Sequence, residues 1–391
     1  MHQFVVAAIK YVRPLYYVYF YLMSFCLNLL GLLVKRDKKL VLISSFGGKK
    51  YDDSPKELYE KMRTDKRFLG YRYVWAFHNP SKFNIPGVAK VKTDSLAYFI
   101  TALKAGIWIT NSSLERGLSF KPEDTLYINT WHGSTIKKMG SDIETVNTSF
   151  RSLGKMKVDI MTAQNEEQAD IFSRVFDIPR ENFLVCGLPR NDFLLAATPG
   201  YIAKVKEQLH LPKRKKIILY APTFREFDRD SRGVVMKPPI NLQKWQDVLN
   251  DDYVLLFRAH YEVAAVLGLA TNDFCRDVTN YPKLNDLLLA ADILISDYSS
   301  VIFDYALLEK PILHYCYDYE RYEAKRGVYM DIREHINGSE YEDSLLELLK
   351  NMDWQAETVR IKLFKENFSL QDGHAVDAVL DAIEKILVFK L

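Results

Sequence analysis

From Lys39 onward, short apolar runs rich in β-branched residues alternate with stretches whose apolar positions recur at helical spacing. The short runs predict buried strands, and the amphipathic stretches predict helices between them. In the first half of the chain the predicted strands are Leu40–Ser44, Tyr71–Ala76, Ile107–Thr110, Leu126–Thr130, Val158–Ala163 and Phe183–Cys186, and the predicted helices are Pro55–Arg63, Ser95–Ala105 and Glu166–Phe176. Strands that alternate with helices indicate βαβ units and a parallel sheet.

A second set of alternating runs follows a break at Pro199-Gly200 and a basic cluster at Lys213–Lys216. Its predicted strands are Ile217–Ala221, Val254–Arg258, Ile293–Ser296 and Ile312–Tyr315, and its predicted helices are Asn285–Ala291 and Val301–Leu308. Beyond Ser339 the spacing is mostly helical. The pattern predicts an α/β protein of two doubly wound sheets facing a cleft, with domains at 39–195 and 196–391 after a segment at 1–38.

The N-terminal segment contains an uncharged apolar run, Leu15–Val34, with basic residues on both flanks. The run is long for a signal peptide, and no small-residue cleavage site follows it. Four tyrosines crowd its first part, and tyrosine prefers the headgroup level of a bilayer. We therefore expect a membrane-associating helix at the cytoplasmic face of the cell membrane. A spanning helix and a buried core helix of a soluble protein remain the alternatives.

Composition narrows the class of protein further. The 391 residues are 48% hydrophobic and 26% charged, which excludes a disordered chain and a multi-span membrane protein. Lys and Arg number 53 against 50 Asp and Glu, a net charge of +3, so a dedicated nucleic-acid binder is not expected. The four cysteines lie far apart without a C-x-x-C motif, which argues against a disulfide framework or a zinc site and favours a reducing compartment.

The loops after the predicted strands carry the candidate chemistry, although neither common phosphate-binding glycine motif is present. No G-x-G-x-x-G or G-x-x-x-x-G-K-[ST] occurs, so dinucleotide-binding and P-loop interpretations lose their main support. The sequence Gly47-Gly48-Lys49-Lys50 follows the first predicted strand. We interpret it as a plain turn rather than a phosphate loop.

His132 stands at the end of one predicted strand and is followed by Gly133. A histidine titrates near neutrality and can take a proton from an attacking hydroxyl. Gly133 would let the backbone approach a ligand closely. The alternative is a structural histidine packed under Trp131, and position alone does not decide between the two.

Two further loops place cationic side chains at strand ends. Thr223 and Arg225 follow one strand and could contact an anion or a nucleotide. Arg258 and His260 lie two residues apart at another strand end, so their side chains would share a side in an extended backbone. Paired cationic donors suit a phosphate. In each case the alternative is a solvated surface loop.

The strongest local signal is a buried strand that ends at Ser296 and is followed by Asp297, with Ser299-Ser300 opening a predicted helix. Free backbone N–H groups at a helix start attract anions, and the hydroxyls add donors. Asp304 lies four residues after Ser300 on the same helix face and could hold ribose hydroxyls. An ordinary helix cap by Asp297 or Ser299 is the alternative interpretation.

Five motifs together resemble the CDP-glycerol glycerophosphotransferase family of teichoic acid synthesis. They occur in family order between about Asn111 and Asp331: TWHGSTIKKMGSDI, CGLPRND, YAPTFREFD, FRAHYEV and SDYSSVIFDYALLEKPILHYCYD. The resemblance implies a GT-B-like fold, with two Rossmann-type domains around a cleft. It also implies transfer of a polyol phosphate from a CDP-alcohol to a hydroxyl of a lipid-linked saccharide at the inner membrane face, releasing CMP.

The resemblance also implies roles for individual residues. His132 matches the family's proposed base, and Arg258 with His260 matches the pair at the donor diphosphate. The helix-terminal phosphate loop matches Ser296, Asp297, Ser299 and Ser300. Because the sequence shows no large N-terminal extension like that of the polymerases, we expect a primase-like or single-addition enzyme, and an enzyme of capsule synthesis is equally compatible. Because no carboxylate cluster suggests a metal site, we expect no tightly bound cofactor, although free Mg²⁺ could assist the diphosphate.

Three alternatives stay open at the level of sequence. One is a GT-B glycosyltransferase that uses a nucleotide sugar, and another is a phosphotransferase specific for CDP-ribitol. A third, of a different class, is a catalytically silent assembly factor at the membrane. The oligomeric state also stays open.

Overall fold

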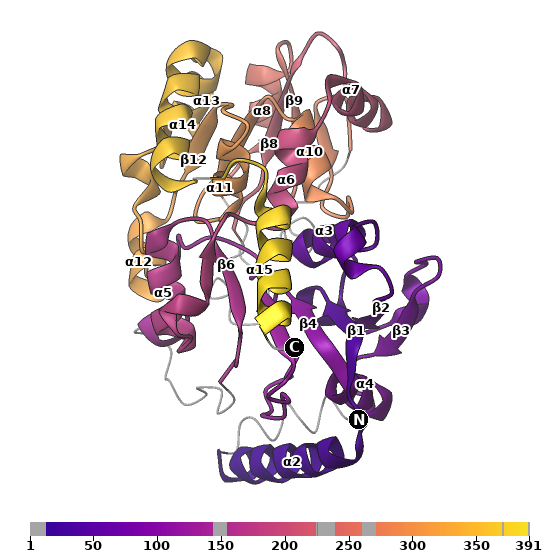
Figure 1. Cartoon of the computed structure of the whole chain (residues 1–391). Helices are drawn as coiled ribbons and strands as arrows, with labels where there is room; N and C mark the ends of the chain where they lie inside the picture. The colour runs from indigo at the N-terminus through magenta and orange to yellow at the C-terminus, as the bar shows by residue number, and fades with distance from the viewer. Residues whose placement is uncertain are drawn as a thin grey trace.

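Two parallel sheets with helices on both faces make up the computed structural model of this chain (Figure 1). The structure describes residues 13–143, 155–223, 225, 239–259, 271–369 and 371–389. The α/β architecture of two doubly wound sheets is therefore confirmed.

The first sheet has seven strands in the described part of the chain, in the order β3-β2-β1-β4-β5-β6-β7, and all pairs are parallel. The strands are β1 (Asp37–Ser44), β2 (Arg72–Phe77), β3 (Ala89–Lys92), β4 (Ala105–Thr110), β5 (Leu126–Asn129), β6 (Ile160–Ala163) and β7 (Phe183–Val185). In the central strand β4 every residue is buried. A continuous apolar run is what a parallel strand covered on both faces requires.

Helices cover both faces of this sheet, each over its own apolar cluster. One face packs under α3 (Asp53–Met62) and the C-terminal helix α15 (Ala375–Phe389), with Leu58 and Val379 fully buried. The other face packs under α4 (Leu96–Lys104) and α5 (Glu166–Phe176). The first half is thus a three-layer α/β/α sandwich.

The second sheet has the order β10-β9-β8-β11-β12-β13 in the described residues, again with parallel pairs. Its strands are β8 (Lys216–Tyr220), β9 (Tyr253–Phe257), β10 (Cys275–Asp277), β11 (Ile293–Ser296), β12 (Ile312–Tyr315) and β13 (Gly338–Ser339). In both sheets the strand order reverses beside the first strand of the set, between β1 and β4 and between β8 and β11. Such a reversal point is where ligands bind in doubly wound folds.

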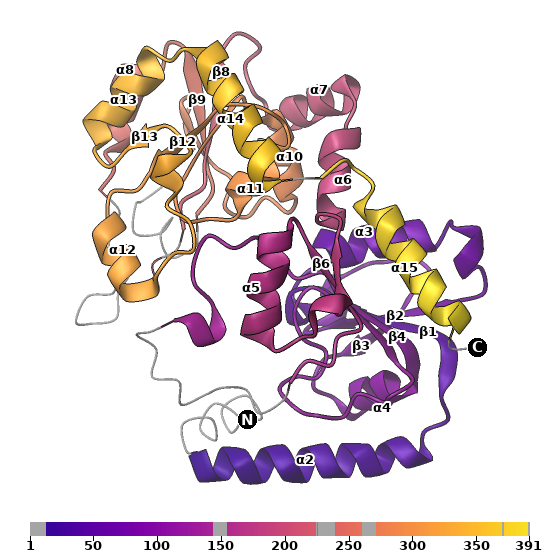
Figure 2. The same ribbon diagram turned by 60° about the vertical axis from the view of Figure 1, so that its left-hand side comes forward.

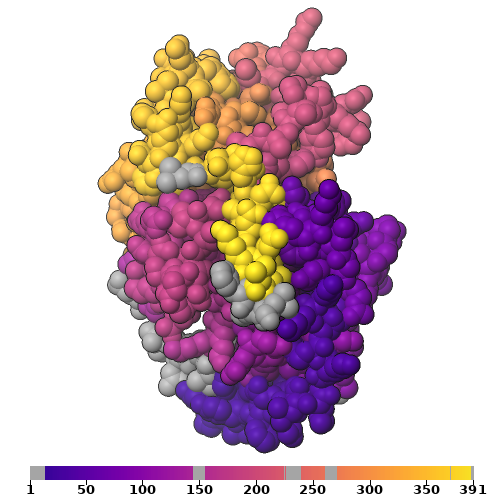
Figure 3. All heavy atoms as spheres, in the orientation of Figure 1, coloured from indigo at the N-terminus to yellow at the C-terminus, as the bar shows by residue number. Residues whose placement is uncertain are grey.

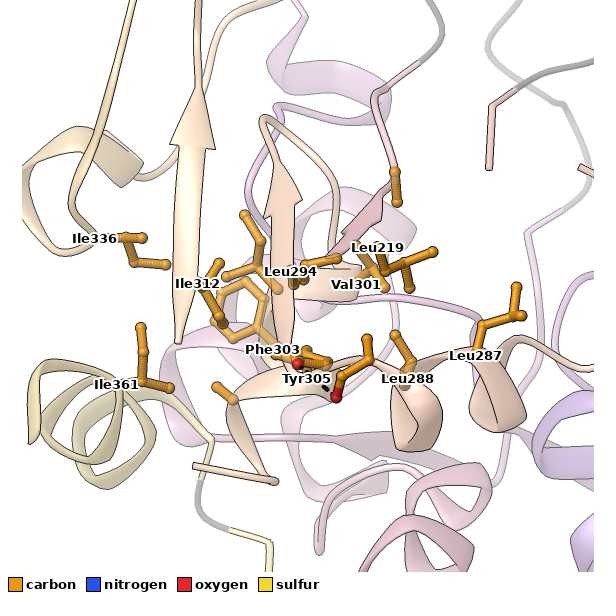
Figure 4. Close-up of a cluster of buried hydrophobic side chains, with 14 of the residues drawn as sticks. Leu219, Leu287, Leu288, Leu294, Val301, Phe303, Tyr305, Ile312, Ile336 and Ile361 are labelled. Carbon is orange, nitrogen blue, oxygen red and sulfur yellow. Dashed lines mark hydrogen bonds between the residues drawn. The ribbon is translucent and has the colours of Figure 1, made fainter. Parts of the chain in front are cut away.

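Helix α6 (Pro189–Ala196) packs against α3 of the first half and α10 of the second and so connects the two. The helices of the second half are α7 (Pro199–Gln208), α8 (Leu242–Leu249), α10 (Leu284–Ala290), α11 (Val301–Ala306), α12 (Tyr319–Arg326), α13 (Glu342–Lys350) and α14 (Trp354–Phe368). One apolar cluster lies between the sheet and the group that includes α10, α11 and α14, and Figure 4 shows Leu294, Ile312 and Phe303 converging in it. A second cluster, around Trp245 and Leu345, packs α8 and α13 on the opposite face.

The C-terminal helix α15 crosses back to the first half of the molecule. Its Val379, Leu380 and Ile383 are fully buried in the cluster over the first sheet, and it packs against α3 and α6. Figures 1 and 3 show this yellow helix against the indigo and magenta half. By packing, α15 belongs with the first sheet, although the domain division drawn from the sequence placed it with residues 196–391. Apolar periodicity identifies a helix but not the sheet that it covers.

At the N-terminus, α2 (Arg13–Leu33) runs lengthwise along the end of the first half that is remote from the second sheet (Figures 1 and 2). Phe20 and Leu27 are buried in the cluster that also contains α4. The main chain of Ser119 pairs with this helix twice, since its N–H donates to Ser24 Oγ (3.0 Å) and its carbonyl accepts from Asn28 Nδ2 (2.8 Å). One face of α2 is therefore docked on the protein.

The opposite face of α2 is apolar and exposed. It presents Val18, Leu22, Phe25 and Leu29, each more than half exposed. Among the described helices, the segment Pro14–Leu33 is long and apolar enough to cross a membrane by length and composition. The predicted apolar helix is therefore present, and it is neither a buried core helix nor free of the protein.

Most predicted strands and helices lie where the pattern placed them, and the differences are short elements. Strands β3, β10 and β13 and helices α6, α7, α8 and α12 were not predicted, and α7 begins at the Pro199-Gly200 pair that was interpreted as a break. Each strand has four residues or fewer, and β3 is largely exposed, so none leaves an apolar run. Helix α6 begins at Pro189 within the sequence Gly-Leu-Pro-Arg-Asn-Asp, which has the composition of a turn.

Candidate functional site

A cavity of about 270 Å³ lies between the two halves, at the carboxyl ends of strands from both sheets. The first half contributes the β1–α3 connection, the start of α3 and the residue after Trp131, and the second half contributes the ends of β9 and β11 and the start of α10. The lining residues are Phe46, Lys50, Asp52, Asp53, Lys56, Glu57, His132, Arg190, Phe193, Arg258, Lys283, Leu284, Asn285, Asp286, Ser299, Ser300, Val301 and Asp304. Both reversal points of strand order therefore open onto one cavity.

His132 lies on the wall that the first half contributes, three residues after the end of β5. Its Nδ1 lies 2.6 Å from the carbonyl oxygen of Asn111, the residue after β4. A carbonyl only accepts hydrogen bonds, so Nδ1 carries the proton and Nε2 keeps a lone pair. Burial lowers the pKa of His132, which favours this neutral form. The geometry thus provides a proton acceptor at Nε2.

The surroundings of His132 fix its ring. It stacks on Trp131, with ring centroids 4.3 Å apart, and lies 5.8 Å from the ring of Phe46. The Phe46 N–H donates to Asn111 Oδ1 (2.7 Å), which ties the loop after β1 to the loop after β4. His132 therefore packs against Trp131, as the structural alternative expected, and at the same time lines the cavity.

Backbone strain gathers around the same ring. Phe46 (φ 49°), Asp53 (φ 66°) and Trp131 (φ 51°) all adopt the left-handed conformation that non-glycine residues avoid. Each costs on the order of 1–3 kcal/mol and persists only where neighbouring contacts enforce it. Concentrated strain of this kind is typical of functional sites.

Gly133 brings the His132 loop against the second half. A Cβ atom at this position would lie 2.6 Å from Ser300 Oγ, closer than van der Waals contact allows. The sequence predicted that a ligand approaches the backbone at Gly133, whereas the structure places the Ser300 side chain against it. This contact places the candidate base beside the Ser299-Ser300 loop.

Arg258 lies at the wall that the second half contributes, directly after β9. Its Nη1 donates to the carbonyl oxygens of Tyr281 (2.8 Å) and Val278 (3.3 Å), which anchor the guanidinium at the cavity. Burial lowers the pKa of Arg258, and Asp52 across the cavity opposes that shift. Ser299, Ser300 and Lys283 line the cavity with it. This wall is rich in donors for an anionic group.

Ser296, Asp297 and Arg225 have partners inside the protein. Ser296 Oγ donates to the carbonyl oxygen of Ala221 (2.7 Å), and Arg225 pairs with Asp297 (2.7 Å) and with Asp318 (2.8 and 2.9 Å). Arg225 is only 4% exposed. These three residues were predicted as substrate contacts. In the structure they instead hold together the loops that follow β8, β11 and β12, and they do not line the cavity.

Thr223 joins the same buried arrangement through its main chain. Its N–H donates to Asp297 Oδ1 (2.8 Å), whereas its hydroxyl is buried without a partner among the described residues. Helix α11, which follows the Ser299-Ser300 loop, has only six residues. A helix this short adds little dipole to the loop.

Asp304 also differs from the sequence-based expectation. Its carboxylate accepts hydrogen bonds from Arg190 Nη2 (2.7 Å) and Asn191 Nδ2 (2.7 Å), and it is 2% exposed. Both carboxylate oxygens thus have protein partners, so the role of holding ribose hydroxyls is not supported. The sequence could not reveal this pairing, because Arg190 lies far from Asp304 along the chain. The motif CGLPRND contains Arg190 but gives no sign of its partner.

Other residues of the site were missed. Asn111, Phe46 and Asp53 were not singled out, because a buried asparagine and a strained turn leave no periodic signal. The loop Gly47–Lys50, interpreted as a turn, does form a turn, and its Lys50 lines the cavity. His260, predicted beside Arg258, lies outside the described residues. Among the described residues, no group of three or more His, Cys, Asp or Glu could hold a metal ion.

The two facing sheets with a site between their carboxyl ends define a protein of the GT-B-like class. Residues 27–385 match the family described as CDP-glycerol:poly(glycerophosphate) glycerophosphotransferase. This chain belongs to that family, and the enzyme class predicted from the motifs is confirmed.

Several relatives support the assignment. Over 89% of its length the chain is 36% identical to a teichoic acid poly(glycerol phosphate) polymerase of Staphylococcus epidermidis, of which it spans 50%. It is 33% identical to a teichoic acid glycerol-phosphate transferase of Staphylococcus aureus, covering 89% of this chain and 94% of that one.

Among solved structures, the wall teichoic acid polymerase TagF superposes with a TM-score of 0.83 at 33% identity, covering 98% of both chains. A variant of the same polymerase has also been solved after a soak with CDPG.

Proposed function

We propose that this protein transfers glycerol phosphate from CDP-glycerol to a hydroxyl of a lipid-linked saccharide at the cytoplasmic face of the membrane, releasing CMP. The observation that carries the proposal is one cavity with a proton acceptor, His132 Nε2, on one wall and an anion-binding set, Arg258 with Ser299 and Ser300, on the other. The CDPG soak of the TagF polymerase and the names of the relatives support the choice of donor.

In the proposed reaction, the acceptor hydroxyl enters from the His132 side. Nε2 takes its proton as the oxygen attacks the phosphorus that bears glycerol, and the bond from that phosphorus to the CMP oxygen breaks. Arg258 and the serine hydroxyls stabilise the charge that develops on the phosphoryl oxygens and on the leaving CMP. Positioning and charge neutralisation supply most of the rate in such transfers. No step requires a tightly bound cofactor, and free Mg²⁺ could assist the diphosphate.

The exposed face of α2 supports attachment at the membrane surface. The helix is docked lengthwise through Phe20, Leu27 and Ser24, so its apolar outer face would enter the headgroup region while the helix stays parallel to the bilayer. An enzyme held there meets a lipid-linked acceptor at a raised effective concentration. Surface attachment is therefore preferred to a span.

The decisive experiment measures CMP release by the full chain with CDP-glycerol, CDP-ribitol and nucleotide sugars, each with detergent-solubilised lipid acceptors. Transfer from CDP-glycerol with stoichiometric CMP supports the proposal. Preference for CDP-ribitol would reassign the polyol, and release of a nucleoside diphosphate from a nucleotide sugar would indicate a glycosyltransferase. Absence of turnover with every donor would favour an assembly factor.

A further inference from the structure

A buried charged bridge crosses from one half of the molecule to the other beneath the cavity. Arg190 Nη1 pairs with Asp53 Oδ2 (2.9 Å), and Arg190 Nη2 pairs with Asp304 Oδ2 (2.7 Å). Arg190 and Asp53 are each 8% exposed, and Asp304 is 2% exposed. Burial opposes the charge of the guanidinium, but the two carboxylates outweigh it and raise the pKa of Arg190, so the positive charge is kept.

Each member of this bridge belongs to a different element. Asp53 opens α3 over the first sheet, Asp304 lies in α11 behind the Ser299-Ser300 loop, and Arg190 lies in α6, where the chain passes between the halves. The main chain of Arg190 makes the same connection, because its N–H donates to Ser54 Oγ (3.2 Å) and its carbonyl accepts from Asn285 Nδ2 (2.8 Å). The residue is thus held from both sides.

The bridge lies close to the reacting groups. Asp53, Arg190 and Asp304 all line the cavity, and the charges of Asp53 and Arg190 both act on His132. Asp53 keeps its left-handed backbone while its carboxylate is paired with Arg190. One end of the bridge therefore lies at the start of α3, on the His132 side of the cavity, and the other end lies in the helix that follows the serine loop.

Stability alone is a poor reason for such a bridge. Apolar residues of similar volume often stabilise a protein as well as a buried ion pair does, whereas a broken pair is costly. A buried charged network can instead specify one arrangement of the elements that it joins. Here those elements are the two walls of the proposed active site.

We propose that Arg190 is a positioning residue, which sets the separation between His132 and the Ser299-Ser300 loop by holding Asp53 and Asp304. This inference rests on the proposed function, because the separation matters only if both walls act on one reaction. A misplacement of about 1 Å can cost on the order of a hundredfold in rate. The bridge thus predicts a loss in turnover rather than in donor affinity.

The test compares Arg190→Met with the uncharged triple variant Asp53→Asn/Arg190→Met/Asp304→Asn. The single variant leaves two buried carboxylates without their partner and is expected to be less stable. The triple variant removes all three charges and is expected to fold, as circular dichroism and thermal melting would show. Its kcat should fall about tenfold to a thousandfold, while calorimetry finds CDP affinity within about threefold of the unaltered chain.

A second readout tests whether the charges of the bridge reach His132, which an ion pair remote from the cavity would not do. In Arg190→Met/Asp304→Asn, the charge of Asp53 remains near His132 without its partner, so the acid limb of kcat/KM should move to higher pH. The matched control is Arg333→Lys, which changes an arginine that pairs with Asp331 and Glu340 outside the cavity. This control should leave kcat, CDP affinity and the pH profile unchanged.

The outcomes are distinct from those of the proposed function. CMP release by the unaltered chain tests the function, whereas the ratio of variant to unaltered turnover tests the bridge with whichever donor is used. A folded triple variant with unaltered kcat would overturn the positioning role. A triple variant that fails to fold would also overturn it, because the bridge would then be part of the stabilising core.

Discussion

At the scale of single residues, the structure assigns the two nitrogens of His132 different tasks. The carbonyl of Asn111 holds the proton on Nδ1, so Nε2 is the atom that can accept one. We expect His132→Gln to lower kcat by roughly 100- to 10,000-fold, while CDP affinity stays within a few-fold. Turnover measured beside calorimetry with CDP checks this, and near-normal turnover would remove the role.

The pH dependence of the rate follows from the same residue. Only neutral His132 can act as a base, and burial lowers its pKa from the ordinary value near 6.5. Activity should therefore persist as pH falls through 6.5 and decline only below it. A kcat/KM profile that already falls between pH 8 and 7 would point to another base.

Arg258 belongs to the donor wall. Arg258→Ala removes charge-assisted hydrogen bonds to a phosphate, on the order of 1.5–3 kcal/mol, or about a ten- to hundredfold loss in affinity. Because CDP retains both phosphates, calorimetry with CDP alone should show most of this loss. If the variant binds CDP normally and only acceptor use suffers, the assignment of the two walls is reversed.

Gly133 tests the contact between the walls. In Gly133→Ala the new methyl group would lie 2.6 Å from Ser300 Oγ and 3.3 Å from Ser300 Cβ, so the Ser300 hydroxyl must turn away from its place at the cavity wall. We expect kcat to fall at least tenfold in a protein that melts near the unaltered temperature. Gly200→Ala is the matched control, since the nearest atom to its new Cβ lies 4.0 Å away. Equal activity of both variants would show that the close approach is not needed.

At the scale of elements, α2 combines a docked face with an exposed apolar face. Complete removal of residues before Lys38 would uncover the cluster that Phe20 and Leu27 fill, so substitutions on the outer face give a cleaner test. We expect the replacement of Val18, Leu22, Phe25 and Leu29 by Ser to weaken binding to anionic vesicles by more than tenfold. Cosedimentation with the vesicles measures this loss.

Two comparisons make the α2 test specific. Activity on a short water-soluble acceptor should stay unchanged in the α2 variant, because the cavity lies at the other end of the first half. Replacement of Val359 and Leu363, which are similarly exposed on α14, should leave vesicle binding unchanged. If the α2 variant cosediments like the unaltered chain, the helix does not attach the protein to the membrane.

At the scale of the whole molecule, periodicity identified both sheets because buried parallel strands are continuous apolar runs, such as β4 and β9. It also found His132 and Arg258, since Arg258 directly follows β9 and His132 lies three residues after the end of β5. It did not find that Asp304 pairs with Arg190 or that Arg225 pairs with Asp318, because these partners are brought together only by tertiary packing. Polar residues at strand ends look alike in sequence whether they face a ligand or each other.

Acid stability is a property of the whole fold to which one buried histidine should make a measurable contribution. His314 in β12 is 6% exposed, and its Nδ1 has no partner among the described residues. Burial, followed by the nearby charge of Arg333, lowers its pKa to about 4. The unfolded chain, with an ordinary value near 6.5, binds this proton first, so stability is fully present above pH 6.5 and is lost as pH falls toward 4.

The contribution of His314 amounts to about 3 kcal/mol across that range, at 1.36 kcal/mol per pH unit. Between pH 7 and pH 4.5 the free energy of unfolding should therefore fall by about 2–3 kcal/mol less in His314→Phe than in the unaltered chain. Urea unfolding at each pH measures this free energy. Comparing the difference between two pH values removes any change in packing that the substitution itself causes. His210→Phe, at an exposed position, should follow the unaltered chain. Parallel pH dependence in all three proteins would mean that His314 accepts its proton in the folded state.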